Sequence, residues 1–322
     1  MFNRRPMVTK KISPRAPRAA SATSDVTAKT PQRADPAKKK TLRAGHATRR
    51  PHRTPPLADT TSEEVTADGQ FVVALARGLE VLRAFRPGEA QMGNNELAKR
   101  TGLPKPTVSR LTHTLTKLGF LSFSAKTMSY ELGAGALSLG YVALSNIDVR
   151  RCARPLMQSL ANDSGFNVGL GMRDQHMMIY TDACEGTGLV GLTLRPGSRI
   201  PIATTAMGRA YLAGLPEDER EALLQELAQQ YDAEWPALLR EIRRANKEVE
   251  TRGFCTSLGD WQKDIYGVAA PIRMPSGQRC YSLNLGGPKY LLSAEQIMIE
   301  LGPRVATLAR EIEQGVDPTS AV

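Results

Sequence analysis

The sequence lacks any hydrophobic run long enough to cross a bilayer. None of its stretches approaches the roughly 18 consecutive apolar residues that a membrane-spanning helix needs. Its first residues also lack the apolar core of a secretory signal. These absences exclude an integral membrane protein, and we expect a cytoplasmic protein that has no membrane partner.

Cysteine is scarce and widely spaced. The four cysteines contain no Cys-x-x-Cys pair, and no histidine lies near them at a spacing typical of metal ligands. This pattern argues against a zinc module and against a disulfide scaffold. We expect reduced, buried thiols and no bound metal.

Motifs of catalysis are also missing. The chain has no Gly-x-Ser-x-Gly elbow, no phosphate loop, no dinucleotide-binding Gly-x-Gly-x-x-Gly and no His-Glu-x-x-His. Only His176 of the four histidines lies beyond residue 140, so a histidine-based triad would depend on a single turn residue. The sequence therefore predicts a protein that is not an enzyme and that needs no cofactor.

Positive charge, in contrast, is plentiful and concentrated at the start of the chain. The first 70 residues hold 15 Lys or Arg and 6 Asp or Glu, out of a total net charge of +11. This segment has few large apolar residues and several proline–arginine clusters, which predicts a disordered basic tail over residues 1–70. Such a tail would add salt-dependent attraction to DNA phosphates, or it would be a solvated leader with no role.

Three amphipathic segments follow the tail. Residues 71–85 repeat apolar side chains at helical spacing, Asn94 or Asn95 can cap a short second helix that ends before Gly102, and Pro106 suits the first turn of a third helix. Residues 120–123 and 128–131 can pair as two strands. A short helix, a glycine turn, a second helix and a hairpin predict a winged helix-turn-helix, whose second helix enters the DNA major groove.

The polar side chains of the third predicted helix are the candidates for DNA contact. Arginine can bond guanine with two hydrogen bonds, and hydroxyl groups and lysine commonly reach phosphates. Arg110 is the strongest candidate for a base or phosphate contact. The full predicted set is Lys105, Thr107, Ser109, Arg110, Thr112 and His113.

These segments resemble the winged helix-turn-helix of the IclR (isocitrate lyase regulator) family of bacterial transcription factors. The resemblance is carried by ARGLEVL at residues 76–82, ELAKRTGLPKPTVSRL at 96–111, LGFL at 118–121 and YELG at 130–133. The family implies homodimers or tetramers, binding to double-stranded operator DNA upstream of catabolic genes, and control by a small organic metabolite.

The rest of the chain reads as a linker helix and an α+β domain. Residues 134–148 are rich in Ala, Leu and Gly at helical spacing, and their apolar surface calls for a partner, either a second subunit or another part of the same chain. Strand-like and helix-like segments then predict an antiparallel sheet with helices on one side, a shape that can hold a small-molecule pocket. Strands are expected at 166–172, 177–184, 189–194, 255–258, 267–272 and 280–285, and helices at 149–164, 205–215, 216–231, 236–252 and 293–314.

The resemblance extends to the family's effector domain through IPI at residues 200–202, TAMGRA at 205–210, RGF at 252–254, GVAAPI at 267–272 and LNLGGP at 283–288. The positions that align with the family's ligand-contacting segments are Thr205, Ala206, Met207, Ser257, Asp260, Trp261, Ile265, Gly267, Ser282 and Asn284, with Leu258 and Gly259 in the same loop as Asp260. Backbone amides at a helix start near Thr205 can hold a carboxylate, although Thr205 can also simply cap its helix.

Two departures from the family pattern leave the effector class open. Many members carry histidine where Ala203 stands and lysine where Arg209 stands. Trp261 lies beside Asp260, where it can stack on an aromatic ligand or simply seal the core.

The expected organisation is therefore a tail (1–70), a winged helix-turn-helix (71–133), a linker helix (134–148), an effector-binding α/β domain with an antiparallel sheet (149–315) and a short end (316–322). The expected function is that of a DNA-binding regulator that responds to a small carboxylic or aromatic acid. The alternative is a constitutive DNA-binding protein whose second domain only oligomerises.

Overall fold

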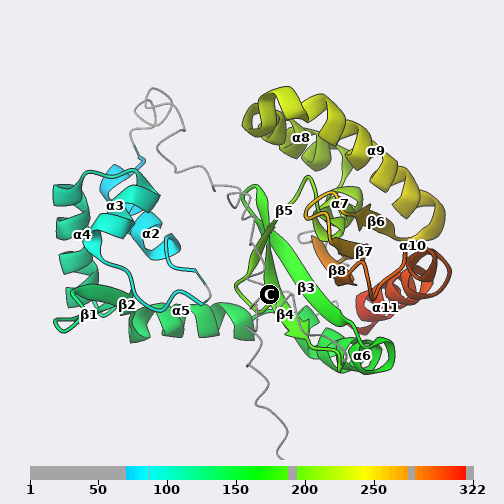
Figure 1. Cartoon of the computed structure of the whole chain (residues 1–322), viewed down its shortest axis with the longest axis horizontal. Coiled ribbons are helices and arrows are strands. Elements are labelled where there is room, and N and C mark those ends of the chain that lie inside the picture. Colours follow the sequence, from blue (N-terminus) through cyan, green and yellow to red (C-terminus); the bar gives the residue numbers. More distant parts are fainter. Residues whose placement is uncertain (1–69, 87, 188–193, 275–279, 317–322) are drawn as a thin grey trace, which may run out of the picture. The chain divides into compact units, whose positions relative to one another are not determined.

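The computed structural model describes residues 70–86, 88–187, 194–274 and 280–316 (Figure 1). The predicted tail up to residue 69 and most of the predicted strand at 189–194 lie outside the described residues. No helix in the described ranges combines the length and the apolar character that crossing a bilayer requires.

The front unit, residues 70–145, contains four helices and a hairpin. Its elements are α2 (Val73–Arg83), α3 (Asn94–Thr101), α4 (Lys105–Lys117), β1 (Leu121–Ser124), β2 (Ser129–Leu132) and α5 (Ala134–Ser145). The two strands pair antiparallel with Leu121 opposite Leu132, and an isolated bridge joins Met92 to Tyr130. This is the predicted winged helix-turn-helix followed by the predicted linker helix.

The turn between α3 and α4 forms as its sequence predicts. Gly102 ends α3 in the left-handed conformation (φ 71°), which a residue without a Cβ adopts readily, and Pro104 precedes the first turn of α4. The predicted asparagine cap is wrong: α3 begins at Asn94, with Gly93 as its N-cap and no side-chain cap. Leu103 plugs the turn and belongs to a small core that it shares with Val81, Met92, Leu97, Val108 and Leu121.

In the rear unit (148–316), the described residues form a six-stranded antiparallel sheet. Its strands are β3 (Asn167–Asp174), β4 (Met177–Cys184), β5 (Arg199–Pro201), β6 (Cys255–Leu258), β7 (Ile265–Arg273) and β8 (Cys280–Pro288), in the order β5-β4-β3-β8-β7-β6. Its helices are α6 (Asp148–Ser164), α7 (Ala206–Gly214), α8 (Glu217–Tyr231), α9 (Trp235–Arg252), α10 (Ala294–Gln296) and α11 (Gly302–Gly315). A 3₁₀ turn (Asp232–Glu234) precedes α9, and a π turn (Ile297–Leu301) joins α10 to α11. The short strand β5 is absent from the sequence prediction.

Helices cover both faces of this sheet, so the expectation of helices on one side is wrong. Helices α6 and α11 pack on one face, against Leu170, Leu283 and Leu285. Helix α7 packs on the opposite face, and α9 packs against α7 (Figure 1). Neighbouring residues of a strand point to opposite faces of the sheet. The continuous apolar runs of β7 and β8 therefore contribute buried side chains to both faces.

The face that α7 covers is built from small residues. Gly169 pairs with Asn284, and Gly267 pairs with Gly286 and with Ser257 in the next strand. A Cβ at Gly169 would lie 2.3 Å from the Tyr180 ring, so that position requires glycine. The missing side chains leave space between the sheet and α7.

Candidate functional site

Helix α4 presents the candidate DNA-contacting surface. Its core face carries Val108 and Thr112, one turn apart, and both are fully buried. The opposite side exposes Lys105, Ser109, Arg110 and His113, with Thr107 half-buried. Five of the six predicted side chains are therefore accessible on one helix.

Thr112 is a correction to the predicted set. Its side chain is 0% exposed, and its hydroxyl lies 3.0 Å from the Val108 carbonyl and 3.3 Å from Asn94 Oδ1. It lies four residues after Val108 and next to Leu111, so helical spacing places it on the core face. Its hydroxyl ties α4 to α3 and is not available to DNA in this structure.

An arginine at the end of α3 stabilises the front unit from within. Arg100 Nε donates to Glu96 Oε1 at 2.8 Å, and its guanidinium also binds Glu89 and the Ala84 carbonyl. These carboxylate hydrogen bonds raise the pKa of Arg100 further above its usual range. Arg100 therefore joins α3 to the segment after α2 and is not free to contact DNA.

A cavity lies between the sheet and the start of α7. None of its lining residues is charged, and most are apolar or small. They are Asn167, Val168, Gly169, Tyr180, Ala183, Leu194, Ile200, Thr205, Ala206, Met207, Ser257, Trp261, Ile265, Tyr266, Gly267, Asn284 and Gly286.

The structure brings eight of the ten predicted effector residues to this cavity: Thr205, Ala206, Met207, Ser257, Trp261, Ile265, Gly267 and Asn284. They come from three places far apart in the chain: the start of α7, the β6–β7 connection with its flanking strands, and β8. This convergence is the geometry of a small-molecule site.

Two predicted effector residues do not line the cavity. The carboxylate of Asp260 accepts a hydrogen bond from Arg209 Nη1 at 2.6 Å instead. Ser282 is 0% exposed, and its hydroxyl lies 3.5 Å from the Ala270 carbonyl. Ser282 pairs with Gly171, and Met207 fills the space above that glycine, which separates Ser282 from the cavity.

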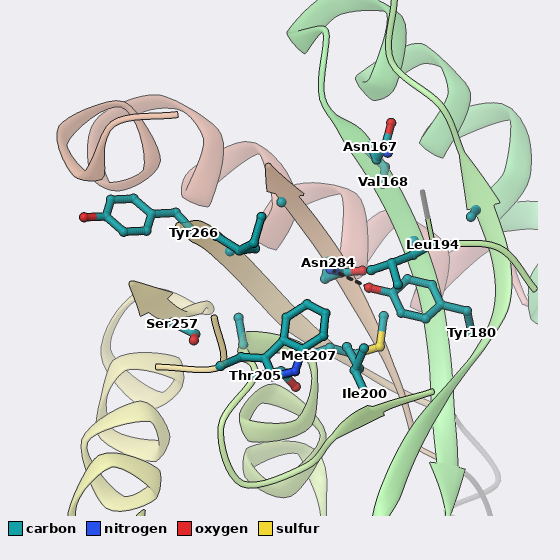
Figure 2. A pocket seen from close by; sticks show the side chains of 17 residues that line it. Asn167, Val168, Tyr180, Leu194, Ile200, Thr205, Met207, Ser257, Tyr266 and Asn284 are labelled. Carbon is teal, nitrogen blue, oxygen red and sulfur yellow. Dashed lines mark hydrogen bonds between the residues drawn. The ribbon is translucent and has the colours of Figure 1, made fainter. Parts of the chain in front are cut away.

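The start of α7 is held by Thr205. Its hydroxyl accepts a hydrogen bond from the Gly208 amide at 3.1 Å and donates one to the Pro201 carbonyl at 2.6 Å. Thr205 therefore caps the helix while it also lines the cavity (Figure 2). The amides of Ala206 and Met207 occupy the first helical positions, where a helix offers no acceptor of its own.

Asn284 and Tyr180 form one polar part of the cavity wall, and they point toward each other in Figure 2. Asn284 Nδ2 donates to the Tyr180 hydroxyl at 3.1 Å. Burial raises the pKa of Tyr180 above its usual value, so the phenol stays protonated. Asn284 Oδ1 is buried and has no hydrogen-bond partner among the described residues, which leaves an acceptor for a ligand.

Sequence reasoning missed the part of the cavity that β3, β4 and β5 supply, with Gly169, Tyr180 and Ile200 as its central members. Alternation along β4 places Met178 and Tyr180 on one face, which is a usable signal. That this face meets Asn284 depends on the pairing of β3 with β8, and no local pattern reveals that pairing.

The described residues contain no cluster of His, Cys, Asp and Glu suited to a metal ion. All four cysteines are free thiols. Burial raises the pKa of Cys255 and of Cys280 to about 12, which makes both thiols poor nucleophiles.

Comparison with known proteins decides the family. Residues 74–124 match the model of the IclR helix-turn-helix domain, and residues 141–314 match that of the bacterial transcriptional regulator IclR C-terminal domain. The chain belongs to the IclR family. It is therefore a DNA-binding transcriptional regulator of the IclR type and not an enzyme.

Individual relatives agree with this placement. The chain is 32% identical to the HTH-type transcriptional regulator TsaQ1/TsaQ2 of Comamonas testosteroni over 79% of this chain and 92% of the relative. It is 42% identical to an IclR family transcriptional regulator from Brucella abortus of known crystal structure. That match covers 78% of this chain and 94% of the other chain, with a TM-score of 0.69. An IclR homologue from Microbacterium hydrocarbonoxydans, solved in complex with 4-hydroxybenzoate, shares the fold at 21% identity, with a TM-score of 0.58 over 75% of this chain and 98% of that one.

Proposed function

We propose that this IclR-type regulator binds an operator through α4. When a small organic acid, carboxylic or aromatic, binds in the cavity beside α7, the affinity of the protein for the operator falls or rises. The observation that carries the ligand half is the unpaired Asn284 Oδ1 in an uncharged, mainly apolar cavity. We further propose that the target genes are catabolic and that the protein acts in the cytoplasm.

The chemistry of the cavity favours a carboxylate with an apolar body. The amides of Ala206 and Met207 point an array of donors and the positive end of the α7 dipole at an anion. Asn284 Oδ1 accepts a hydrogen bond from a second polar group of the ligand, and the remaining wall suits a ring or short chain. The 4-hydroxybenzoate complex of the Microbacterium relative supports a ligand of this size and type.

The accessible side chains of α4 support the DNA half of the proposal. Arg110 is the proposed base-reading residue, with Lys105, Thr107, Ser109 and His113 as phosphate or base contacts. Recognition of this kind depends on the start of the second helix entering the major groove.

A symmetric oligomer, dimer or tetramer, is the proposed working form. Helix α5 has no buried residue among its twelve, and it exposes Leu137, Leu139, Tyr141 and Val142. A second copy that covers these side chains would place two α4 helices for two half-sites of an operator.

The test is fluorescence anisotropy of the purified full chain on labelled DNA from upstream of its own gene, at fixed salt, with and without a panel of aromatic and short-chain acids. An acid that shifts the operator affinity names the effector class. Thermal stability is measured in parallel, because a ligand that binds only the folded state adds about 2.7 kcal/mol at a hundredfold excess over its Kd.

Two variants locate the site. Asn284→Leu removes the unpaired acceptor and is expected to abolish the ligand response while operator binding persists. Thr251→Ala, on the exposed side of α9, is the matched control and should respond like the parent. Specific DNA binding that no acid alters would favour the constitutive alternative, in which the rear unit only oligomerises.

A further inference from the structure

A fully buried arginine lies one turn beyond the cavity-lining start of α7. Arg209 is 0% exposed. Its Nε donates to the Ala203 carbonyl at 2.9 Å, and its Nη1 donates to Asp260 Oδ2 at 2.6 Å. Its Nη2 has no hydrogen-bond partner among the described residues. A buried guanidinium is tolerated only where it is paired, so Asp260 matters to the charge balance of α7.

Asp260 belongs to the connection between β6 and β7, residues 259–264. Gly259 begins this connection in the left-handed conformation (φ 91°), and its amide donates to the Ile265 carbonyl at 3.1 Å. At the far end, the carboxylate of Asp264 pairs with Lys289 Nζ at 2.8 Å, on the surface. The connection therefore has one ion pair to the interior and one to the exterior.

Trp261 follows Asp260 directly and is the aromatic residue that this connection brings to the cavity. It lines the cavity and packs against the apolar cluster that contains Met207 and Ile202. Because consecutive Cα atoms are about 3.8 Å apart, fixing the Asp260 carboxylate on α7 limits how far the Trp261 indole can move.

We propose that Arg209 and Asp260 are positioning residues: their ion pair holds the Trp261 indole in place as a flat wall of the cavity, which selects planar aromatic acids over aliphatic ones. This inference rests on the proposed ligand-binding function. Arg209 lies on α7, whose first amides bind the carboxylate of the ligand in the proposed function. The ion pair therefore holds the Trp261 indole at a fixed position relative to those amides. A planar ring contacts both, whereas a short aliphatic acid contacts only the helix start.

The first experiment needs no ligand. The chain has two tryptophans, so Trp235→Phe leaves Trp261 as the sole indole fluorophore. In that background, Asp260→Asn is expected to raise acrylamide quenching and to shift the emission to the red, because the indole leaves the cavity wall. Asp260→Glu retains the charge and is expected to restore most of the protection. Asp264→Asn, which breaks the outer ion pair of the same connection, is the matched control and should leave quenching unchanged.

The quenching results can overturn the proposal in two ways. Equal quenching in Asp260→Asn and the parent would show that the ion pair does not position Trp261. Equal increases in Asp260→Asn and Asp264→Asn would show a general loosening of the connection. Asp260→Asn leaves the buried Arg209 without its carboxylate partner and lowers stability, so a circular dichroism melt checks that each variant is folded at the temperature of the quenching measurement. Asp260→Ser repeats the test if Asp260→Asn does not fold.

The second experiment tests selectivity with benzoate and pyruvate, two carboxylates that differ in the ring, by titration calorimetry on the full chain. Asp260→Asn is expected to weaken benzoate binding by up to about tenfold, the scale of one lost ring-stacking contact, and to leave pyruvate binding unchanged. Equal losses for both acids would overturn the aromatic-wall role. If neither acid binds the parent, the proposed ligand class fails, while the quenching data still decide whether the pair positions Trp261.

Discussion

The front unit (70–145) and the rear unit (148–316) differ in how many of their large apolar side chains they bury. The rear unit buries most of them on both faces of its sheet, in clusters that include Leu283 and Ile312 on one face and Leu212 on the other. The front unit buries a core of six residues and exposes several large apolar side chains. They are Phe71, Val72, Val73, Leu75, Leu79, Leu118, Phe123, Met128, Leu132, Leu137, Leu139, Tyr141 and Val142.

This difference indicates that the two units differ in how much of their apolar surface their own fold can bury. A six-stranded sheet with helices on both faces offers enough interior to bury its own apolar residues. Four short helices and a two-stranded hairpin do not. A contiguous exposed apolar surface usually marks an interface. The front unit is therefore the part of the molecule whose apolar surface is suited to a partner.

The largest expected effect is on assembly. We predict that Leu137→Glu combined with Tyr141→Glu, at side chains that are 74% and 71% exposed, dissociates the proposed oligomer by placing charges on the α5 surface that would form its interface. Operator affinity should fall by about a hundredfold or more, because the gain from binding two linked half-sites is lost. Sedimentation equilibrium and anisotropy measure both effects.

The control for assembly is Tyr290→Glu, at a side chain of the rear unit that is also 74% exposed. If the α5 double variant retains the parent's mass and affinity, α5 does not form the interface. If Tyr290→Glu dissociates the oligomer instead, the rear unit carries the contact.

The next largest effect is on folding. Leu283→Ala removes a fully buried side chain from the sheet and is expected to lower the free energy of unfolding by about 2–5 kcal/mol. Leu139→Ala, at a position 61% exposed on α5, should change it by about 0.5 kcal/mol or less in the monomeric double-variant background. Urea unfolding followed by circular dichroism compares them, and similar losses would contradict the contrast between the units.

A smaller effect is expected at the proposed DNA-contacting surface of α4. Arg110→Ala should weaken specific operator binding by about 1–3 kcal/mol at fixed salt. Lys117→Ala, at the far end of α4, should weaken specific and nonspecific binding alike and only slightly. An unchanged affinity in Arg110→Ala would show that another residue reads the operator.

The smallest expected effect is on the rate at which the thiols of the rear unit are alkylated. A thiol whose pKa is about 12 stays protonated between about pH 7 and 9, so Cys280 and Cys255 should resist alkylation across that range until the protein unfolds. Cys152 is partly exposed and should react in the native state. Mass spectrometry of iodoacetamide-treated protein identifies the labelled sites, and native labelling of Cys255 would show that the core opens.

Much of the fold follows from local patterns. The bounds of β4 and β6 agree with the strands expected at 177–184 and 255–258, and the helices differ by a residue or two at most ends. Thr112 shows where a local pattern was misread, because its residue type suggested a surface position while its spacing from Val108 placed it in the core. The strand β5 was missed because three residues are too short to show alternation.

The site was predictable only in part. The start of α7 and Asn284 came from the resemblance to the family, and the structure places both at the cavity. The partnership of Asp260 with Arg209, and that of Tyr180 with Asn284, joins residues 51 and 104 positions apart. Contacts over such separations depend on strand register and helix placement, which the sequence does not display.

Local sequence patterns establish the classes of segment. Apolar spacing indicates the helices, the lack of a Cβ at Gly102 indicates the turn, and the order of these segments indicates the winged helix-turn-helix. Tertiary structure alone decided which face of each strand meets α7, why Met207 excludes Ser282 from the cavity, and which polar atom stays unpaired. The difference arises from the separation along the chain over which each effect acts. Backbone preference and periodicity act over a few residues, whereas burial and hydrogen-bond pairing depend on neighbours that only the folded chain brings together.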